Sequence, residues 1–96
     1  MIPSDYRLVE KYDTVMEVGS LKLATRTKHL EIILSLSRML SKKSWISLSR
    51  DDINTLVIVV MRSYSADGEE TNTTYDHKKI LKIFFRWLKL GSRFQY

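Results

Sequence analysis

The chain has 96 residues, 44% of them hydrophobic and 28% charged, with a formal net charge of +5 and no cysteine. This length and composition predict one globular domain, and the missing cysteines exclude disulfides and thiolate metal sites. Because the longest apolar run, at 56–61, is too short to cross a bilayer and the N-terminus lacks a signal-peptide pattern, we expect a soluble cytoplasmic domain.

Four helices are predicted in chain order, at about 5–18, 25–41, 50–64 and 73–89, which together form an all-α, compact bundle of four short helices. The first follows PSD and stops at Gly19, and the fourth stops at Gly91. Ser49 with Asp52 forms a capping box before the third, and Thr73 with Asp76 suggests another before the fourth. The β-branched run at 56–61 would also suit a strand, but the capping box and the sustained helical period favour a helix.

Residues at helical spacing, mostly apolar, predict which side of each helix faces the core. In chain order these residues are Leu8, Tyr12, Val15 and Met16; Leu30, Ile33, Leu34, Ser37 and Leu40; Ile53, Leu56, Val57, Val60, Met61 and Tyr64; Ile80, Leu81, Phe84, Trp87 and Leu88. Trp45, between the second and third helices, is interpreted as a plug at a helix end rather than a base-stacking residue.

Basic charge is concentrated in two blocks of the sequence. Residues 22–43 and 76–96 each hold six cations and one anion, whereas 1–21 and 44–75 have net charges of −2 and −3. In the last helix the cations fall on the side opposite the aromatic residues, and no acidic residue follows Asp76. Such a stripe is either a solvated face or a surface that lies along phosphates, and the missing acids favour phosphates. A membrane-surface helix would expose an apolar face that this domain needs for its own core.

The stretch TTYDHKKILKIFFRWL resembles the closing helix of the core-binding domain of archaeal tyrosine recombinases, the integrases of the phage-integrase superfamily. The positions that match the family pattern are Thr73, Asp76, His77, Lys78, Leu81, Lys82, Phe84, Phe85, Arg86, Trp87 and Leu88. Upstream, Lys28 to Leu30 and the pair Asp52 and Ile53 resemble two further helices of the family, so the resemblance covers roughly residues 20–93. Two departures are His29, where a tyrosine is usual, and a longer, more acidic loop before the last helix.

The resemblance implies a small SAM-like helical bundle that forms half of a C-shaped clamp around DNA during integration and recombination. In that family the second and fourth helices face the duplex, and cleavage belongs to a separate C-terminal domain with an Arg-Lys-His-Arg constellation and a tyrosine nucleophile. The implied partners are double-stranded DNA and that catalytic domain of the full-length protein. The isolated domain is expected to be monomeric, and the full-length protein tetrameric on DNA.

The residues expected to contact DNA come from the second and fourth helices and their flanks: Thr25, Arg26, Lys28, His29, Lys42, Lys43, Thr73, Thr74, Tyr75, Lys78, Lys79, Lys82 and Arg86. No catalytic residue is expected, because neither His29 nor His77 has an arginine three residues later and no stabilising cluster precedes Tyr96. We therefore expect no enzymatic activity from this chain by itself. No cofactor or metal is expected either, because two histidines without cysteine do not supply a zinc site and no glycine-rich phosphate loop is present.

Two alternative functions stay open at this point. A protein-interaction bundle of the SAM or death-domain kind would pair helical surfaces of opposite charge, which the acidic first and third helices would suit. A stand-alone nucleic-acid binder with a helix-turn-helix would need a basic recognition helix, whereas residues 50–64 are acidic and apolar.

Overall fold

The chain forms four α-helices and one short 3₁₀ helix in a computed structural model, which describes residues 3–40, 43–64, 69 and 71–90. The helices are α1 (Pro3–Val18), α2 (Leu23–Met39), α3 (Arg50–Tyr64) and α4 (Asn72–Leu90), and the 3₁₀ helix η1 spans Trp45–Ser47. The described residues contain no β-strand, so the predicted all-α architecture of four helices is confirmed, including the helical state of 56–61. Within these residues, no helix has the length and apolar character needed to span a membrane.

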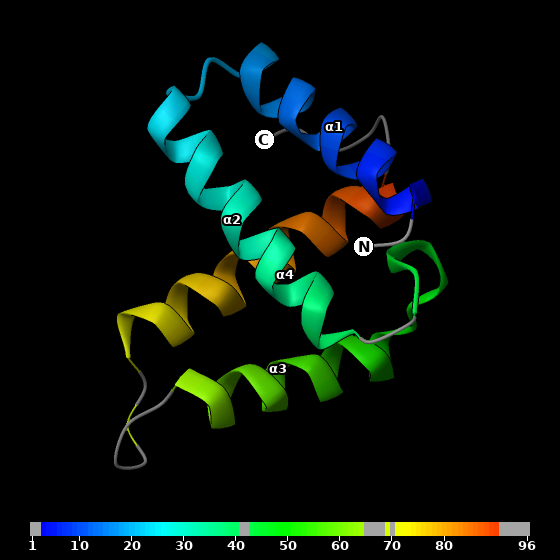
Figure 1. The fold of residues 1–96 in the computed structure, drawn as a ribbon, viewed down its shortest axis with the longest axis vertical. Coiled ribbons are helices and arrows are strands. Elements are labelled where there is room, and N and C mark those ends of the chain that lie inside the picture. Colours follow the sequence, from blue (N-terminus) through cyan, green and yellow to red (C-terminus); the bar gives the residue numbers. More distant parts are fainter. Residues whose placement is uncertain (1–2, 41–42, 65–68, 70, 91–96) are drawn as a thin grey trace.

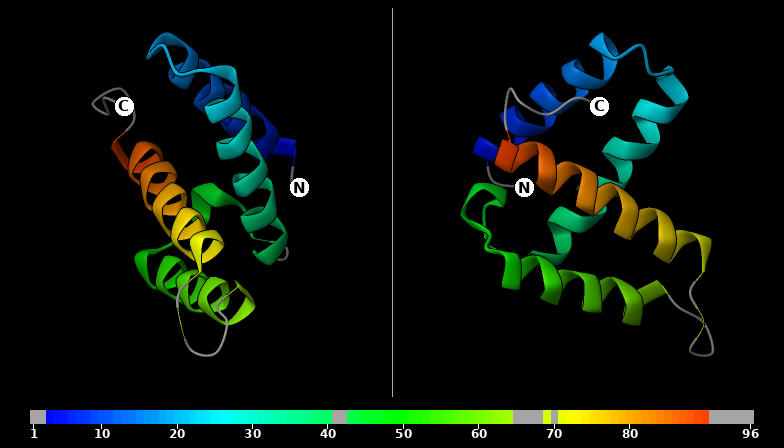
Figure 2. Two further views of the ribbon diagram at one scale, coloured as in Figure 1. Left: turned by 90° about the vertical axis from the view of Figure 1, so that its left-hand side faces the viewer. Right: turned by 180° about the vertical axis from the view of Figure 1, so that it is seen from behind.

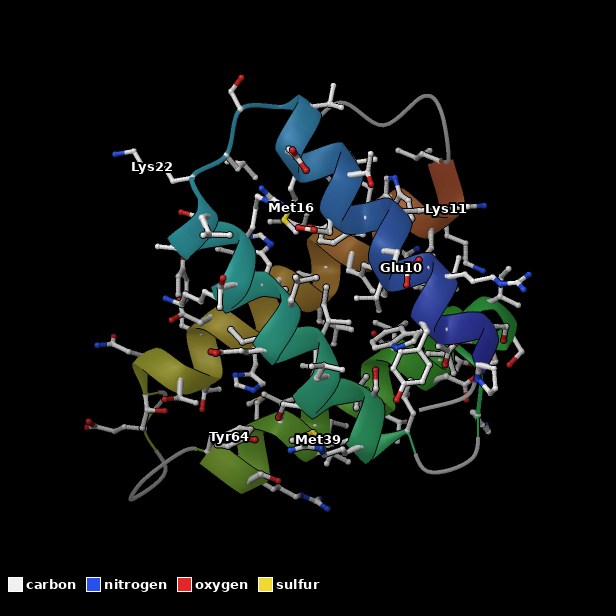
Figure 3. The ribbon with its side chains drawn as sticks, turned by 45° about the horizontal axis from the view of Figure 1, so that its top comes forward. Glu10, Lys11, Met16, Lys22, Met39 and Tyr64 are labelled. Atoms are coloured by element: carbon white, nitrogen blue, oxygen red, sulfur yellow. The ribbon has the colours of Figure 1, made fainter. Side chains whose placement is uncertain are left out.

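The central helix is α2, which packs against α1, α3 and α4. α1 and α2 are joined by a short turn and diverge from it, α4 crosses behind α2, and α3 lies at the opposite end of the molecule (Figure 1). Seen from behind, α4 lies in front with α3 beside it (Figure 2). Met16 points inward between α1 and α2, while Lys11 and Lys22 point outward (Figure 3). α4 also packs against α3, and each of the two helices α2 and α4 keeps one side at the surface.

The core is organised around aromatic rings from α1, η1 and α4. Phe84 lies edge-on to Tyr12 and to Trp45, with ring centres 5.0 and 4.9 Å apart. Trp87 is half-buried and packs against Tyr12 at 5.3 Å, so the aromatic side of α4 faces inward as predicted. Trp45 is fully buried, and its backbone N–H donates to the buried carboxylate of Asp5 at 3.3 Å. The η1 segment thus plugs the gap between α1 and α4 and stabilises the start of α1.

The predicted capping box at the start of α3 is confirmed. The Asp52 backbone N–H donates to Ser49 Oγ at 3.2 Å, and the Ser49 N–H donates back to Asp52 Oδ2 at 2.9 Å. The Lys43 ammonium donates to the same carboxylate at 3.0 Å. These donors, led by the Ser49 backbone, lower the pKa of Asp52 to about 2.

The second predicted capping box is wrong. α4 begins at Asn72, and Thr71 caps it, because Thr71 Oγ1 accepts from the Thr74 backbone N–H at 3.2 Å. The carboxylate of Asp76 is instead paired with Lys28 on α2, at 2.8 Å. A threonine two residues earlier thus takes the capping position, which leaves Asp76 available for a contact between helices. The predicted stop at Gly91 lies outside the described residues.

The predicted inward side of α2 is rotated from the observed one. Leu34 is 38% exposed, while Ile32 and Leu36 are buried together with the polar side chain of His29. On α3, Met61 was also expected in the core but is 44% exposed. Both helices carry apolar residues on nearly all sides, so periodicity alone does not determine which side the neighbouring helices cover.

A polar cluster links α2, α3 and α4 next to the apolar core. Ser35 Oγ lies 3.0 Å from the Tyr64 hydroxyl and 3.4 Å from His77 Nε2. The Nδ1–H of His77 donates to the Thr73 carbonyl at 2.8 Å, and the His77 and Tyr64 rings lie 4.5 Å apart. Each helix therefore contributes one polar side chain to a shared set of hydrogen bonds.

Candidate nucleic-acid interface

One side of α4 carries cations that the bundle leaves at the surface. Because residues three, four and seven positions apart share one side of a helix, four cations lie together, and we call them the α4 basic face: Lys78, Lys79, Lys82 and Arg86. With Tyr75 they line a shallow depression whose residues all belong to α4 and include no carboxylate. Lys79, Lys82, Arg86 and Tyr75 are exposed, and Lys78 is half-buried. The structure thus brings five of the predicted residues together on one helix.

The ion pairs of the described residues lie elsewhere, and they join Arg26 to Asp13 and Glu17, Lys28 to Asp76, and Lys43 to Asp52. Across the described part of the chain, no carboxylate is paired with Lys79, Lys82 or Arg86. These three cations therefore keep their full charge toward an incoming anion.

The basic surface continues from α4 onto the start of α2. A hollow between the two helices is lined by Thr25 and Lys28 of α2 and by Asp76 and Lys79 of α4. Lys28 is exposed, but its ammonium lies 2.8 Å from the Asp76 carboxylate, which offsets part of its charge. Thr25 and Thr73 are also exposed. α2 therefore adds one partly neutralised cation to the face that α4 presents.

Two other predicted cations are held by carboxylates. Arg26 donates from Nε and Nη2 to the two oxygens of Asp13, at 2.8 and 2.9 Å, and from Nη2 to Glu17 at 3.3 Å. This bidentate contact lowers the pKa of Asp13 and raises the pKa of Arg26. Lys43 donates to Asp52 at 3.0 Å. Arg26 thus faces α1 and Lys43 faces the start of α3, so neither joins the α4 basic face.

The expectation that His29 and Thr74 contact DNA needs correction, because both side chains are buried. His29 is 7% exposed, and its Nδ1 lies 3.3 Å from the Tyr12 hydroxyl, while Thr74 has no exposed surface. Burial first, and then the nearby charges of Lys79 and Lys28, lower the pKa of His29. His29 also lines the α2–α4 hollow, so its ring can respond to charge there although little of its surface is exposed.

Two cations that were not among the predicted DNA-contacting residues extend the basic surface toward α3. Lys89 lies one turn beyond the α4 basic face, and Arg50 is the first residue of α3. Both line a groove that also includes Lys82. The helical spacing of Lys89 was a usable signal, but Arg50 belongs to an acidic segment and only the fold brings it near α4. The predicted residue Lys42 lies outside the described residues.

Comparison with known proteins adds no further assignment. No protein-family model, curated protein or solved structure matches the chain. In the residues that the structure describes, no three histidine, aspartate or glutamate side chains are grouped so that they could hold a metal ion. The functional argument therefore depends on the side chains of the basic surface.

Proposed function

We propose that this chain binds duplex DNA through the α4 basic face, as the non-catalytic core-binding domain of a tyrosine recombinase. The observation that carries the DNA part is the set of three exposed cations, Lys79, Lys82 and Arg86, with no described carboxylate paired to them. Each cation that replaces a condensed counterion on a phosphate releases that counterion to the solvent, which favours binding.

The dimensions of the face suit a DNA duplex. Lys79 and Arg86 are seven residues apart, so they span about 10 Å along the helix axis, comparable with the roughly 12 Å width of a major groove. Tyr75 stands at the N-terminal end of the same side and is 57% exposed, so its hydroxyl can donate to a phosphate. α4 can therefore lie along or within a groove while its aromatic side stays in the core.

The recombinase part of the proposal depends on the sequence resemblance, above all on the last helix. In a protein of that family this chain would hold the duplex, and a separate catalytic domain would cleave it. The α4 basic face supports the assignment because the fourth helix is one of the two that face DNA in the family. The second such helix, α2, contributes through Lys28 and Thr25. The full-length protein would then act as a tetramer on DNA.

Salt dependence tests the DNA part of this proposal directly. Fluorescence anisotropy with a labelled duplex of about 20 base pairs, between roughly 50 and 200 mM salt, should give a log–log slope of about −3 to −4.5, from three to five contacts at about −0.9 each. An affinity that does not change with salt would contradict phosphate binding. The reading frame that encodes the chain tests the recombinase part, since a domain with His-x-x-Arg and a later tyrosine should follow residue 96.

A further inference from the structure

A groove of about 640 Å³ lies between the start of α3 and the end of α4, and we call it the α3–α4 groove. Its apolar residues are Ile53, Val57, Phe85 and Leu90, and its polar residues are Arg50, Asn54, Lys82, Arg86 and Lys89. Ile53 is buried at 6% exposure, whereas Leu90 is 45% exposed. The groove therefore has an apolar floor that opens to solvent toward the end of α4.

The rim of the groove has one sign of charge. Four cations line it without any carboxylate, and in the described residues none of the four is part of an ion pair. Lys89 Nζ is held over the floor, 5.1 Å from the centre of the Phe85 ring and 3.3 Å from the Leu48 carbonyl. A ligand in the groove would meet apolar side chains at its base and positive charge at its edges.

We propose that the α3–α4 groove binds an acidic amphipathic helix of a partner protein. The apolar floor needs apolar side chains to cover it, which a sugar–phosphate backbone does not supply. The uniform positive rim needs carboxylates and rejects a basic partner, since like charges in contact oppose binding. A helix with leucine or phenylalanine on one side and glutamate around it meets both requirements.

The length of the groove sets the size of the bound segment. Lys82 and Leu90 mark its ends on α4 and are eight residues apart, about 12 Å along the helix axis. About two turns of a partner helix cover that distance, so apolar side chains at positions i, i+4 and i+7 can reach the floor. A segment of about 12 residues then leaves acidic residues on both sides to contact the rim.

The groove shares Lys82 and Arg86 with the α4 basic face, so an acidic helix and DNA would exclude each other. The proposal does not depend on DNA binding, because the floor and Arg50 belong to the groove alone. If DNA does bind, however, an acidic partner would displace it without changing the fold.

Binding of synthetic peptides to the 96-residue chain tests the proposal. The probe is a fluorescent helix of about 12 residues with leucine and phenylalanine at i, i+4 and i+7 and glutamate elsewhere. One control peptide replaces its apolar residues with serine, and the other replaces its glutamates with glutamine. The probe should bind at least about tenfold more tightly than either control, because each control lacks one of the two features that the groove matches.

A matched pair of variants locates the binding. Asn54→Glu puts a carboxylate inside the groove, whereas Thr55→Glu makes the same charge change on an exposed neighbour that does not line it. The first should weaken the probe about fivefold or more, and the second should change affinity by less than about twofold. Both positions are exposed, so circular dichroism and melting should show the fold retained.

Several results would overturn the proposal. Equal binding of the probe and its serine control would mean that charge alone attracts the peptide, and equal effects of the two variants would place it elsewhere. Absence of probe binding, together with binding to anionic vesicles that Asn54→Glu weakens, would assign the groove to a membrane surface. Self-association that Asn54→Glu abolishes would assign it to a second copy of the chain. A chain that fails to bind DNA but still binds the probe would contradict the proposed function and leave the groove proposal standing.

Discussion

α2 with its flanks and α4 with its tail carry equal formal charge, +5 each over residues 22–43 and 76–96. Around α2, three of the six cations, Arg26, Lys28 and Lys43, are each bound by a carboxylate within 3.0 Å, whereas Lys22 and Arg38 are exposed without such a partner in the described residues. On α4, Lys79 and Lys82 are exposed and have no such partner in the described residues. Equal charge in the sequence therefore becomes unequal charge at the surface.

The cause of this difference is the position of the two helices in the bundle. Arg26 and Lys28 of α2 lie within reach of carboxylates on α1 and α4, and Lys43, beyond the end of α2, reaches a carboxylate of α3. α4 turns its aromatic side toward the core and leaves Lys79, Lys82 and Arg86 exposed. The affinity for a polyanion should therefore depend on the number of unpaired cations on one side of a helix, rather than on the net charge of a sequence segment.

Two triple variants test the comparison most strongly. Each replaces three cations with glutamine. The α4 triple changes Lys79, Lys82 and Arg86, and the triple around α2 changes Arg26, Lys28 and Lys43. The α4 triple should lower DNA affinity at least about tenfold and make the salt slope shallower by up to about three contacts, with little change in melting. The triple around α2 should lower the melting temperature and change affinity by less than about threefold. Equal losses of affinity would show that only net charge matters.

Asp76→Asn should give α2 one more unpaired cation. It removes the carboxylate that lies 2.8 Å from Lys28, whose side chain is 58% exposed. DNA affinity should rise by about two- to fivefold, and the salt slope should steepen by about 0.9, one contact. Glu10→Gln, the same charge change at an exposed residue of α1, serves as the control in the same anisotropy titration. An equal rise in both variants would contradict release of Lys28.

Asp13→Asn should separate stability from binding. The variant removes the bidentate acceptor of Arg26, so the melting temperature should fall by about 2–5 °C, while DNA affinity stays within about twofold. Because the pKa of Asp13 is lowered from 3.8 in the folded state, this stabilisation is present above pH 3.8 and is lost as the pH falls below it. Melting curves of the two proteins should therefore converge in acid. A large loss of DNA affinity would place Arg26 at the interface.

The smallest expected effect is a shift in the pKa of His29, which depends on nearby cations of α2 and α4. Its pKa is lowered by burial, then by Lys79, then by Lys28, so Lys79→Gln should raise this pKa more than Lys28→Gln. NMR titration of the ring measures both shifts. The folded state favours the neutral ring, because the folded pKa of His29 lies below 6.5. The contribution of His29 to folding stability is therefore fully present above pH 6.5 and is lost as the pH falls through the folded pKa. A larger shift from Lys28→Gln would contradict the neutralising role of Asp76.

Much of the fold could be predicted, because in some helices the pattern of polar and apolar residues identifies the core-facing side without ambiguity. α4 separates cations from aromatic residues, so its core side follows directly from its period, and Ser49 with Asp52 marks the start of α3. The core side of α2 could not be predicted, since Leu34 and Leu36 are equally apolar and only the neighbouring helices distinguish them.

The candidate site was predictable on α4 and less so on α2. The exposed cations Lys79 and Lys82 follow from periodicity, which is a property of one helix. The partners of Arg26 and Lys28 are contributed by α1 and α4, and pairings between distant segments leave no local signal. Arg50 was missed for the same reason, because the packing of α3 against α4 brings it to the surface near Lys82.

The polar cluster of Ser35, Tyr64 and His77 limits how this chain can change over evolution. Ser35 is hydrogen-bonded to both Tyr64 and His77, so replacing Ser35 alone leaves two hydrogen-bonding groups without this partner, at a cost of about 1–3 kcal/mol for each group that is buried. Replacing all three with apolar residues of matching volume avoids that cost, so the energies of single substitutions should not add. In descendants of this sequence, the residues at positions 35, 64 and 77 should therefore change together.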